Sequence, residues 1–225
     1  MNGEESVVCD SSALISLTDS CFLPLLYELK KRMRGGFLIT PVVRYESIEH
    51  PMKIREHAMA AIRLLNAERD GVIQTVAKDL KKEREEVLWI TNNLFIVNGR
   101  PLNLVQAGEA EALALAAQAG VKNILIDERT TRMLIEAPLA LKEHMEKEFE
   151  GKVEVNEEYL GRLGELTKGL SAFRSCELVA LAFERGYFKK YGEAERQALE
   201  AALYTVKFAG CGVSFEEIES YLKGV

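Results

Sequence analysis

Short apolar segments followed by helical patterns recur along the first two thirds of the chain. Ser6–Cys9, Phe37–Thr40 and Asn123–Ile126 are each apolar on both faces, and a helical pattern follows each of them. Continuous apolar runs of this length are typical of buried strands in a parallel sheet whose two faces are covered by helices. We therefore predict an α/β fold, with three layers arranged α/β/α around a mainly parallel central sheet.

Further helices are predicted from the spacing of apolar positions at about Met52–Glu68, Gly108–Ala119 and Glu128–Leu134. Lys152–Val155 is a short apolar stretch that we interpret as a candidate edge strand. These elements place the α/β domain within residues 1–155.

The last third of the chain has a different pattern, in which helical periods follow one another. Ser214 stands three residues before Glu217, and this spacing is typical of a helix N-terminus. No low-complexity linker precedes this region, so we expect residues 156–225 to form a helical C-terminal extension packed on the α/β domain. Residues 139–172 look like an insertion of unassigned role.

Composition limits the classes of protein that the chain can belong to. Of its 225 residues, 48% are hydrophobic, which is enough to bury a sizeable core. No apolar run is long enough for a bilayer and no secretory leader pattern opens the chain, so we expect a cytoplasmic protein with no membrane partner. Four scattered cysteines and three scattered histidines predict neither a disulfide scaffold nor a zinc site. The net charge of −6 argues against nonspecific coating of nucleic acid but allows a local basic groove.

Acidic residues occupy corresponding places along the chain. Asp10 and Asp127 end the first and third strand candidates, Glu46 follows the second, and Glu109 and Glu111 begin the helix before the third. The carboxyl ends of parallel strands meet at one edge of a sheet, so these carboxylates should converge there. In a partly dehydrated cleft the negative charges of these carboxylates repel one another strongly unless cations bind. Oxygen ligands without histidine or thiol favour Mg²⁺ or Mn²⁺.

Simpler interpretations exist for the same acidic residues. Asp10 can cap the helix that begins after it, and both Glu109 and Glu111 can complement the dipole of a helix N-terminus. The two glutamates are about 200° apart around a helix, so we expect only one of them, Glu111, to face the site.

Four segments contain these acids in order: VVCDSSALISL, TPVVRYES, GEAEALALA and ILIDERTTRMLI. Together they resemble the four acidic motifs of the PIN-domain family, metal-dependent ribonucleases related to the flap-type 5′ nucleases. The resemblance covers about residues 5–136. It implies that Asp10, Glu46, Glu111 and Asp127 are the catalytic, metal-binding acids.

A mechanism is implied by the same resemblance. Asp10 and Asp127 would hold the principal Mg²⁺ or Mn²⁺, and the other two acids would complete its shell or hold a second ion. A metal-bound water would attack the RNA phosphodiester in line. Ser11, Ser12 and Glu109 would be supporting residues, with one of the serines beside the first acid.

Contact with RNA has to come from local positive charge. Arg129 and Arg132 closely follow the fourth acid, and we expect them to contact RNA phosphates. Arg129 also departs from the family pattern, since many members carry an aspartate there; Leu125 likewise replaces a hydroxyl residue. Two denser basic stretches have simpler explanations. Lys30–Arg34 can compensate the dipole at a helix C-terminus, and Lys78–Arg84 can form a solvated helix face.

The resemblance extends to partners and to one alternative function. The C-terminal region resembles the last helices of a prokaryotic, often archaeal, PIN subgroup, which permits a toxin role with a neutralising antitoxin; PIN-like domains also often form homodimers. The main alternative is a catalytically silent PIN-like scaffold that binds RNA or a protein. A nucleotide-binding domain is not favoured, because neither of its phosphate-binding motifs, GxGxxG and GK[ST], occurs in the sequence. A phosphatase with Asp10 as nucleophile would usually carry a second aspartate where Ser12 stands.

Overall fold

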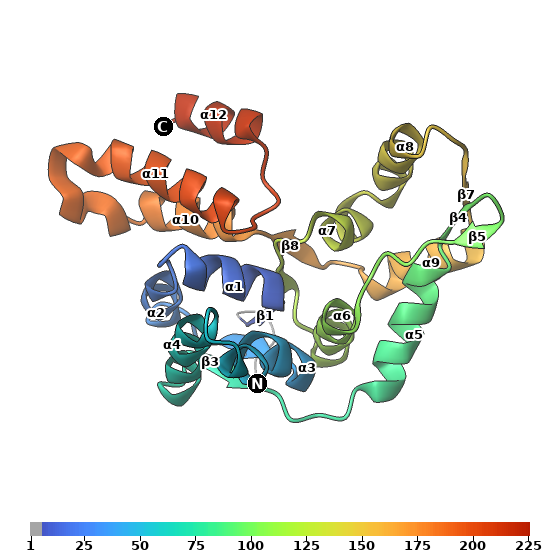
Figure 1. Ribbon diagram of the computed structural model, residues 1–225, viewed down its shortest axis with the longest axis horizontal. Helices are drawn as coiled ribbons and strands as arrows, with labels where there is room; N and C mark the ends of the chain where they lie inside the picture. Colours follow the sequence, from blue (N-terminus) through green and yellow to red (C-terminus); the bar gives the residue numbers. More distant parts are fainter. Residues whose placement is uncertain (1–5) are drawn as a thin grey trace.

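The computed structural model describes residues 6–225 of the protein and has a five-stranded parallel sheet at its centre (Figure 1). The strand order is β3-β2-β1-β6-β8, and each neighbouring pair is parallel. This sheet, with helices on both faces, confirms the predicted α/β class. The strands are β1 (Val7–Cys9), β2 (Phe37–Ile39), β3 (Ile73–Thr75), β6 (Asn123–Leu125) and β8 (Ser171–Phe173).

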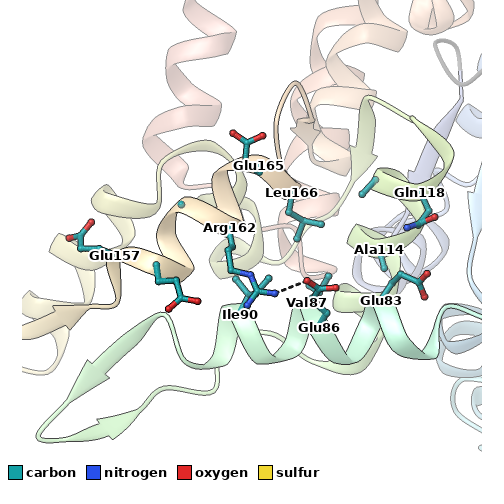
Figure 2. Close-up of a pocket in the computed structure, with 13 residues that line it drawn as sticks. Glu83, Glu86, Val87, Ile90, Ala114, Gln118, Glu157, Arg162, Glu165 and Leu166 are labelled. Carbon is teal, nitrogen blue, oxygen red and sulfur yellow. Dashed lines mark hydrogen bonds and ion pairs between the residues drawn. The ribbon is translucent and has the colours of Figure 1, made fainter.

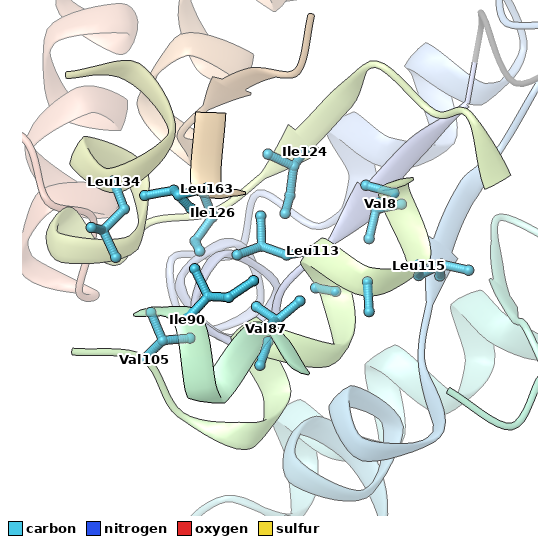
Figure 3. Packing of buried hydrophobic residues seen from close by; sticks show 14 of the residues in the cluster. Val8, Val87, Ile90, Val105, Leu113, Leu115, Ile124, Ile126, Leu134 and Leu163 are labelled. Carbon is cyan, nitrogen blue, oxygen red and sulfur yellow. The ribbon is translucent and has the colours of Figure 1, made fainter. Parts of the chain in front are cut away.

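Side chains of the central strands alternate between two hydrophobic cores. Val8 and Ile124 face the core beneath α5 (Lys81–Asn92) and α6 (Ala107–Ala119), where Leu113 packs between them and α5 (Figure 3). Cys9 and Phe37 face the opposite core. The first core contains side chains of α5 (Lys81–Asn92), α6 (Ala107–Ala119), α7 (Arg129–Glu136), α8 (Pro138–Glu148) and α9 (Glu157–Leu166), and the second those of α1 (Ser11–Asp19), α2 (Pro24–Lys30), α3 (Pro41–Arg44) and α4 (Ala58–Arg69).

The C-terminal region forms a third core from α10 (Ser175–Glu184), α11 (Glu195–Phe208) and α12 (Phe215–Lys223), with the 3₁₀ segment Tyr187–Ala194. Residues 156–225, predicted as a helical C-terminal extension, also contain one strand. β8 pairs with β6 and completes the central sheet. The predicted boundary at residue 155 therefore does not separate the sheet from the last helices; residues 1–5 of that predicted domain lie outside the described part.

A second, antiparallel sheet lies away from the central one (Figure 1). It contains β4 (Phe95–Val97), β5 (Arg100–Pro101) and β7 (Val153–Val155). The candidate strand at Lys152–Val155 is therefore present, but in this small sheet. Asn98 and Gly99, both at positive φ, form the two-residue turn between β4 and β5.

The segment between β2 and α4 departs from the single helix predicted at Met52–Glu68. Tyr45–Glu49 forms a π-helical turn, Pro51–Lys53 a 3₁₀ turn, and α4 begins only at Ala58. Pro51 lacks the backbone N–H that a continuous α-helix needs, which explains the break. The π-helical turn carries Glu46, so the irregular backbone lies at a candidate site residue. No helix within residues 6–225 is both long and apolar enough to cross a membrane.

Candidate functional site

The candidate site lies at the carboxyl edge of the central sheet, where β1 and β6 end. Asp10 directly follows β1, and Asp127 lies two residues beyond β6. The π-helical turn that follows β2 and α3 carries Glu46, and the first two turns of α6 carry Glu109 and Glu111. Parallel pairing of β1 with both β2 and β6 brings these segments to one edge.

Asp10 is both a helix cap and a buried acid with an unused oxygen. Its Oδ2 accepts hydrogen bonds from the backbone N–H of Ser12 at 2.9 Å and from Ser12 Oγ at 2.6 Å. Its Oδ1 is buried and has no hydrogen-bond partner within residues 6–225. Burial raises the pKa of this carboxyl group, which is 1% exposed. The cap interpretation therefore accounts for one carboxylate oxygen only.

Glu46 reaches from the π-helical turn to the N-terminus of α6. Its Oε2 accepts a hydrogen bond from Ser11 Oγ at 2.9 Å. A Cβ on Gly108 would lie 2.4 Å from the same Oε2, so only glycine permits this approach. Burial raises the pKa of Glu46, and the charges of Asp10 and Glu111 raise it further.

Both candidate third acids are coupled to Glu46, although only Glu111 was expected to face the site: the charge of Glu111 raises the pKa of Glu46, and the charge of Glu46 raises that of Glu109. Glu111 Oε2 accepts from the Val42 N–H at 3.0 Å, and its Oε1 lies 3.5 Å from Arg84 Nη1. Burial raises the pKa of Glu109 to about 7, and the charges of Asp10, Glu128 and Glu46 contribute. Glu46 approaches α6 at Gly108, in the same first turns of the helix as Glu109 and Glu111. Both glutamates are therefore near Glu46, although they are about 200° apart around the helix.

Asp127 is buried and is held by the first residue of α10. Its Oδ1 accepts from the Ser175 N–H and its Oδ2 from Ser175 Oγ, both at 2.7 Å. Ser12 connects it to the first acid, because Ser12 Oγ accepts from the Asp127 N–H at 3.1 Å while donating to Asp10. The two strand ends are thus joined by a hydroxyl group.

Ser175 and Glu128 are site residues that the sequence did not reveal. Glu128 caps α7 by accepting from the N–H groups of Thr130 and Thr131, at 2.9 and 2.6 Å. Its charge raises the pKa of Asp10 and of Glu109, so it belongs to the same electrostatic cluster. The position of Glu128 directly after Asp127, at the end of the third strand candidate, was the one sequence feature that could have indicated it.

The oxygen donors at this edge fit a hard divalent cation in their chemistry. Asp10 offers a buried oxygen without a donor among residues 6–225. Burial raises the pKa values of Asp10, Glu46 and Glu109, the charges of neighbouring acids raise them further, and a cation would relieve this repulsion. Within the described part of the chain, however, no three His, Cys, Asp or Glu side chains close around a common point that could hold a metal ion. A cation would therefore have to draw these carboxylates together.

The predicted RNA-binding residues lie on α7, which begins two residues after Asp127. Arg129 is exposed, and its side chain has no hydrogen bond or ion pair with any of residues 6–225. Arg132 pairs with Glu136 at 2.8 Å. Both arginines therefore belong to the helix that begins directly after Asp127 and Glu128.

A groove between α5, α6 and α9 lies apart from these acids (Figure 2). It has a volume of about 690 Å³, apolar side chains such as Val87 and Ile90, and a glutamate-rich rim. Arg162 in α9 pairs with Glu86 in α5 at 2.6 Å across it. None of the predicted site acids lines the groove.

We expect Gly108→Ala to weaken metal binding without unfolding the protein. The new Cβ would displace the Glu46 carboxylate from Ser11, whereas alanine is a better helix former than glycine. Titration of Mn²⁺ followed by thermal unfolding should show at least about a tenfold loss of apparent affinity, which corresponds to roughly 1.4 kcal/mol. Gly161→Ala is the control, because its Cβ would meet no atom within 4 Å. Equal Mn²⁺ affinity in both variants would contradict a role of Glu46 in metal binding.

The metal-free protein should lose stability as the pH rises from about 4.5 to about 7. In the folded protein the pKa of Glu109 is raised from its ordinary value of 4.5 to about 7. The folded state therefore binds more protons than the unfolded state in this interval, and the free energy of unfolding falls by roughly 1–3 kcal/mol. Urea unfolding in EDTA at several pH values measures this.

Glu109→Gln should flatten that pH dependence, because glutamine keeps the oxygen that accepts from the Gln106 N–H but cannot titrate. Glu165→Gln is the control, since Glu165 is well exposed and lines the separate groove between α5, α6 and α9. A slope that persists in Glu109→Gln would assign the pH dependence to other groups.

Comparison with known proteins does not assign this site. No family model matches the chain, and a search of curated proteins finds no match. The chemistry of the site therefore has to be argued from its own residues.

Proposed function

We propose that the protein is a PIN-like endoribonuclease that hydrolyses RNA phosphodiesters with Mg²⁺ or Mn²⁺. The observation that carries the proposal is the buried Oδ1 of Asp10, which has no hydrogen-bond partner within residues 6–225, beside carboxyl groups whose pKa values are raised by burial and further by the charges of neighbouring acids. Burying several carboxylates at one sheet edge lowers stability, and binding of a cation there is the simplest explanation for this arrangement. The four-motif resemblance supports the choice of RNA hydrolysis.

The proposed cation would be held by Asp10 and Glu46, with Glu111, Asp127 and Glu109 as further carboxylates at the same edge. When bound, Mg²⁺ or Mn²⁺ supplies Lewis acidity, which lowers the pKa of water and offsets the negative charge that develops on the phosphate.

The chain's own residues orient these acids. Ser12 fixes the rotamer of Asp10 with two hydrogen bonds, and Ser11 holds Glu46. Glu111 is held by a backbone N–H and lies near Arg84. Arg129, free of partners among residues 6–225, is available to a substrate phosphate. No side chain has to act as the nucleophile.

A silent PIN-like scaffold is the second candidate, and one observation favours it. Both carboxylate oxygens of Asp127 already accept hydrogen bonds from Ser175, so this acid has no unpaired oxygen for a cation in this arrangement. A scaffold of this kind would bind RNA or a protein partner without turnover. The antitoxin, the homodimer and the cytoplasmic location remain predictions of the sequence.

The test is cleavage of a fluorescently labelled RNA by the purified protein with Mg²⁺, with Mn²⁺ and with EDTA. We expect internal cleavage that requires the metal, stops in EDTA and resumes when Mn²⁺ is added in excess. Mn²⁺-induced thermal stabilisation without any RNA turnover would favour the scaffold instead. Cleavage that continues in EDTA would exclude the proposed chemistry.

A further inference from the structure

A second cleft lies directly beside the acidic cluster, between α7 and the loop that leads into α12. Its volume is about 660 Å³. The Gly212 N–H in this loop donates to the carbonyl oxygen of Asp127 at 3.1 Å, so one wall of the cleft touches the chain at the fourth acid. Arg129, Arg132 and Lys207 contribute to its lining.

Positive charge in this cleft is only partly neutralised. Arg129 is exposed and has no partner within the described residues, and Arg132 Nε is buried without one. The two acids of the cleft are already paired: Glu136 with Arg132, and Glu217 with Arg174 at 3.0 Å. The cleft therefore carries a surplus of positive charge in a protein whose net charge is −6.

Exposed aromatic rings continue the cleft along α11 and α12. Phe208 is 76% exposed and Phe215 45% exposed, and their ring centroids are 6.2 Å apart. Lys207, which lines the cleft, places its Nζ 4.3 Å from the centroid of the Phe215 ring. Ser214, the residue before Phe215, also lines the cleft. Basic and aromatic side chains thus form one continuous surface.

We propose that these residues form an accessory RNA subsite, which we call the basic–aromatic surface: Arg129, Arg132, Lys207, Phe208 and Phe215. A phosphate next to the scissile one lies against the arginines, and an unpaired base of the same strand stacks on Phe208 or Phe215. This proposal rests on the proposed function, because it takes the acidic cluster as the place where the strand is cut.

The chemistry of the surface favours an unpaired nucleotide over a protein partner. Exposed aromatic rings interleaved with cations bind single strands because every base offers a stacking face and every phosphate a charge. A paired base is already stacked within a duplex and cannot lie on a phenylalanine ring. An acidic peptide could use the arginines but would gain little from two aromatic rings in tandem.

Binding is measured by fluorescence anisotropy of a labelled 12-nucleotide single-stranded RNA in EDTA, so that cleavage does not occur. We expect Phe208→Ala and Phe215→Ala each to weaken binding about tenfold, and Arg129→Ala to weaken it and to reduce the salt dependence by about one charge. Phe149→Ala is the matched control, since this exposed ring directly follows α8 and does not line the cleft. Phe215→Trp retains a stacking face and should restore binding even if Phe215→Ala disturbs α12.

Several outcomes overturn the subsite. It is wrong if the wild-type protein does not bind the RNA, if the Phe208 and Phe215 variants bind as tightly as Phe149→Ala, or if a duplex of the same sequence or an acidic peptide competes as well as the single strand. The result is separable from the nuclease test. If the surface variants lose RNA binding but the wild type shows no metal-dependent cleavage, the RNA-binding surface is supported and the nuclease is refuted. If the wild type cleaves RNA but the surface variants bind it as tightly as the wild type does, the nuclease is supported and the subsite is refuted.

Discussion

We expect the Asp10→Asn variant to lose at least about a hundredfold of its metal-dependent RNA cleavage rate while remaining folded. Asparagine keeps an oxygen that can accept from the Ser12 N–H, so the cap of α1 survives. It removes the negative charge that a cation would require, and one such interaction is worth several kcal/mol, or about two to three powers of ten in rate. Single-turnover cleavage in saturating Mn²⁺ measures the loss.

The metal-free Asp10→Asn protein should be at least as stable as the wild type, because burial raises the pKa of this carboxyl group and thus disfavours its charged form. Asp19→Asn is the control: it makes the same chemical change at the exposed end of the same helix. Cleavage that persists in Asp10→Asn at the rate of Asp19→Asn would exclude this site.

We expect Arg174→Ala to lower the free energy of unfolding by about 2–4 kcal/mol. The guanidinium is nearly buried, contacts Glu177 in α10 and lies 3.0 Å from Glu217 in α12. It also donates to the carbonyl oxygen of Gly212 at 2.9 Å. Its loss leaves two acids and a carbonyl group without their shared donor.

Urea unfolding at pH 7 measures this effect, and Arg174→Lys should fall between the wild type and Arg174→Ala, because lysine keeps the charge but not the planar fork. Arg162→Ala is the control. Its ion pair with Glu86 is well exposed, so its loss should cost less than about 1 kcal/mol. If both alanine variants lose the same amount, Arg174 does not hold the C-terminal helices together.

The central strands could be predicted from the sequence because burial on both faces leaves a continuous apolar run. Val7–Cys9 and Asn123–Leu125 are almost entirely buried, and their runs are plain in the sequence. Edge strands leave no such signal. Ser171–Phe173 has no fully buried residue and Ile73–Thr75 has one, so neither strand was predicted.

The candidate site could be predicted only as far as local sequence encodes it. Asp10 and Asp127 follow apolar strands, and parallel topology then brings them to one edge. The hydrogen bonds between Ser175 and Asp127 join residues 48 positions apart and depend on how α10 packs. The approach of Glu46 to Gly108 likewise depends on the π-helical turn, which has no recognised pattern in the sequence.

The late position of Ser175 determines when the acidic edge can assemble during synthesis. Asp127 leaves the ribosome 48 residues before the serine whose backbone and hydroxyl groups satisfy both of its carboxylate oxygens. At 5–20 residues per second, this interval lasts roughly 2–10 seconds. A nascent chain therefore carries the aspartate for several seconds before its hydrogen-bond donors exist, and this part of the acidic edge can close only after Ser175 has been synthesised.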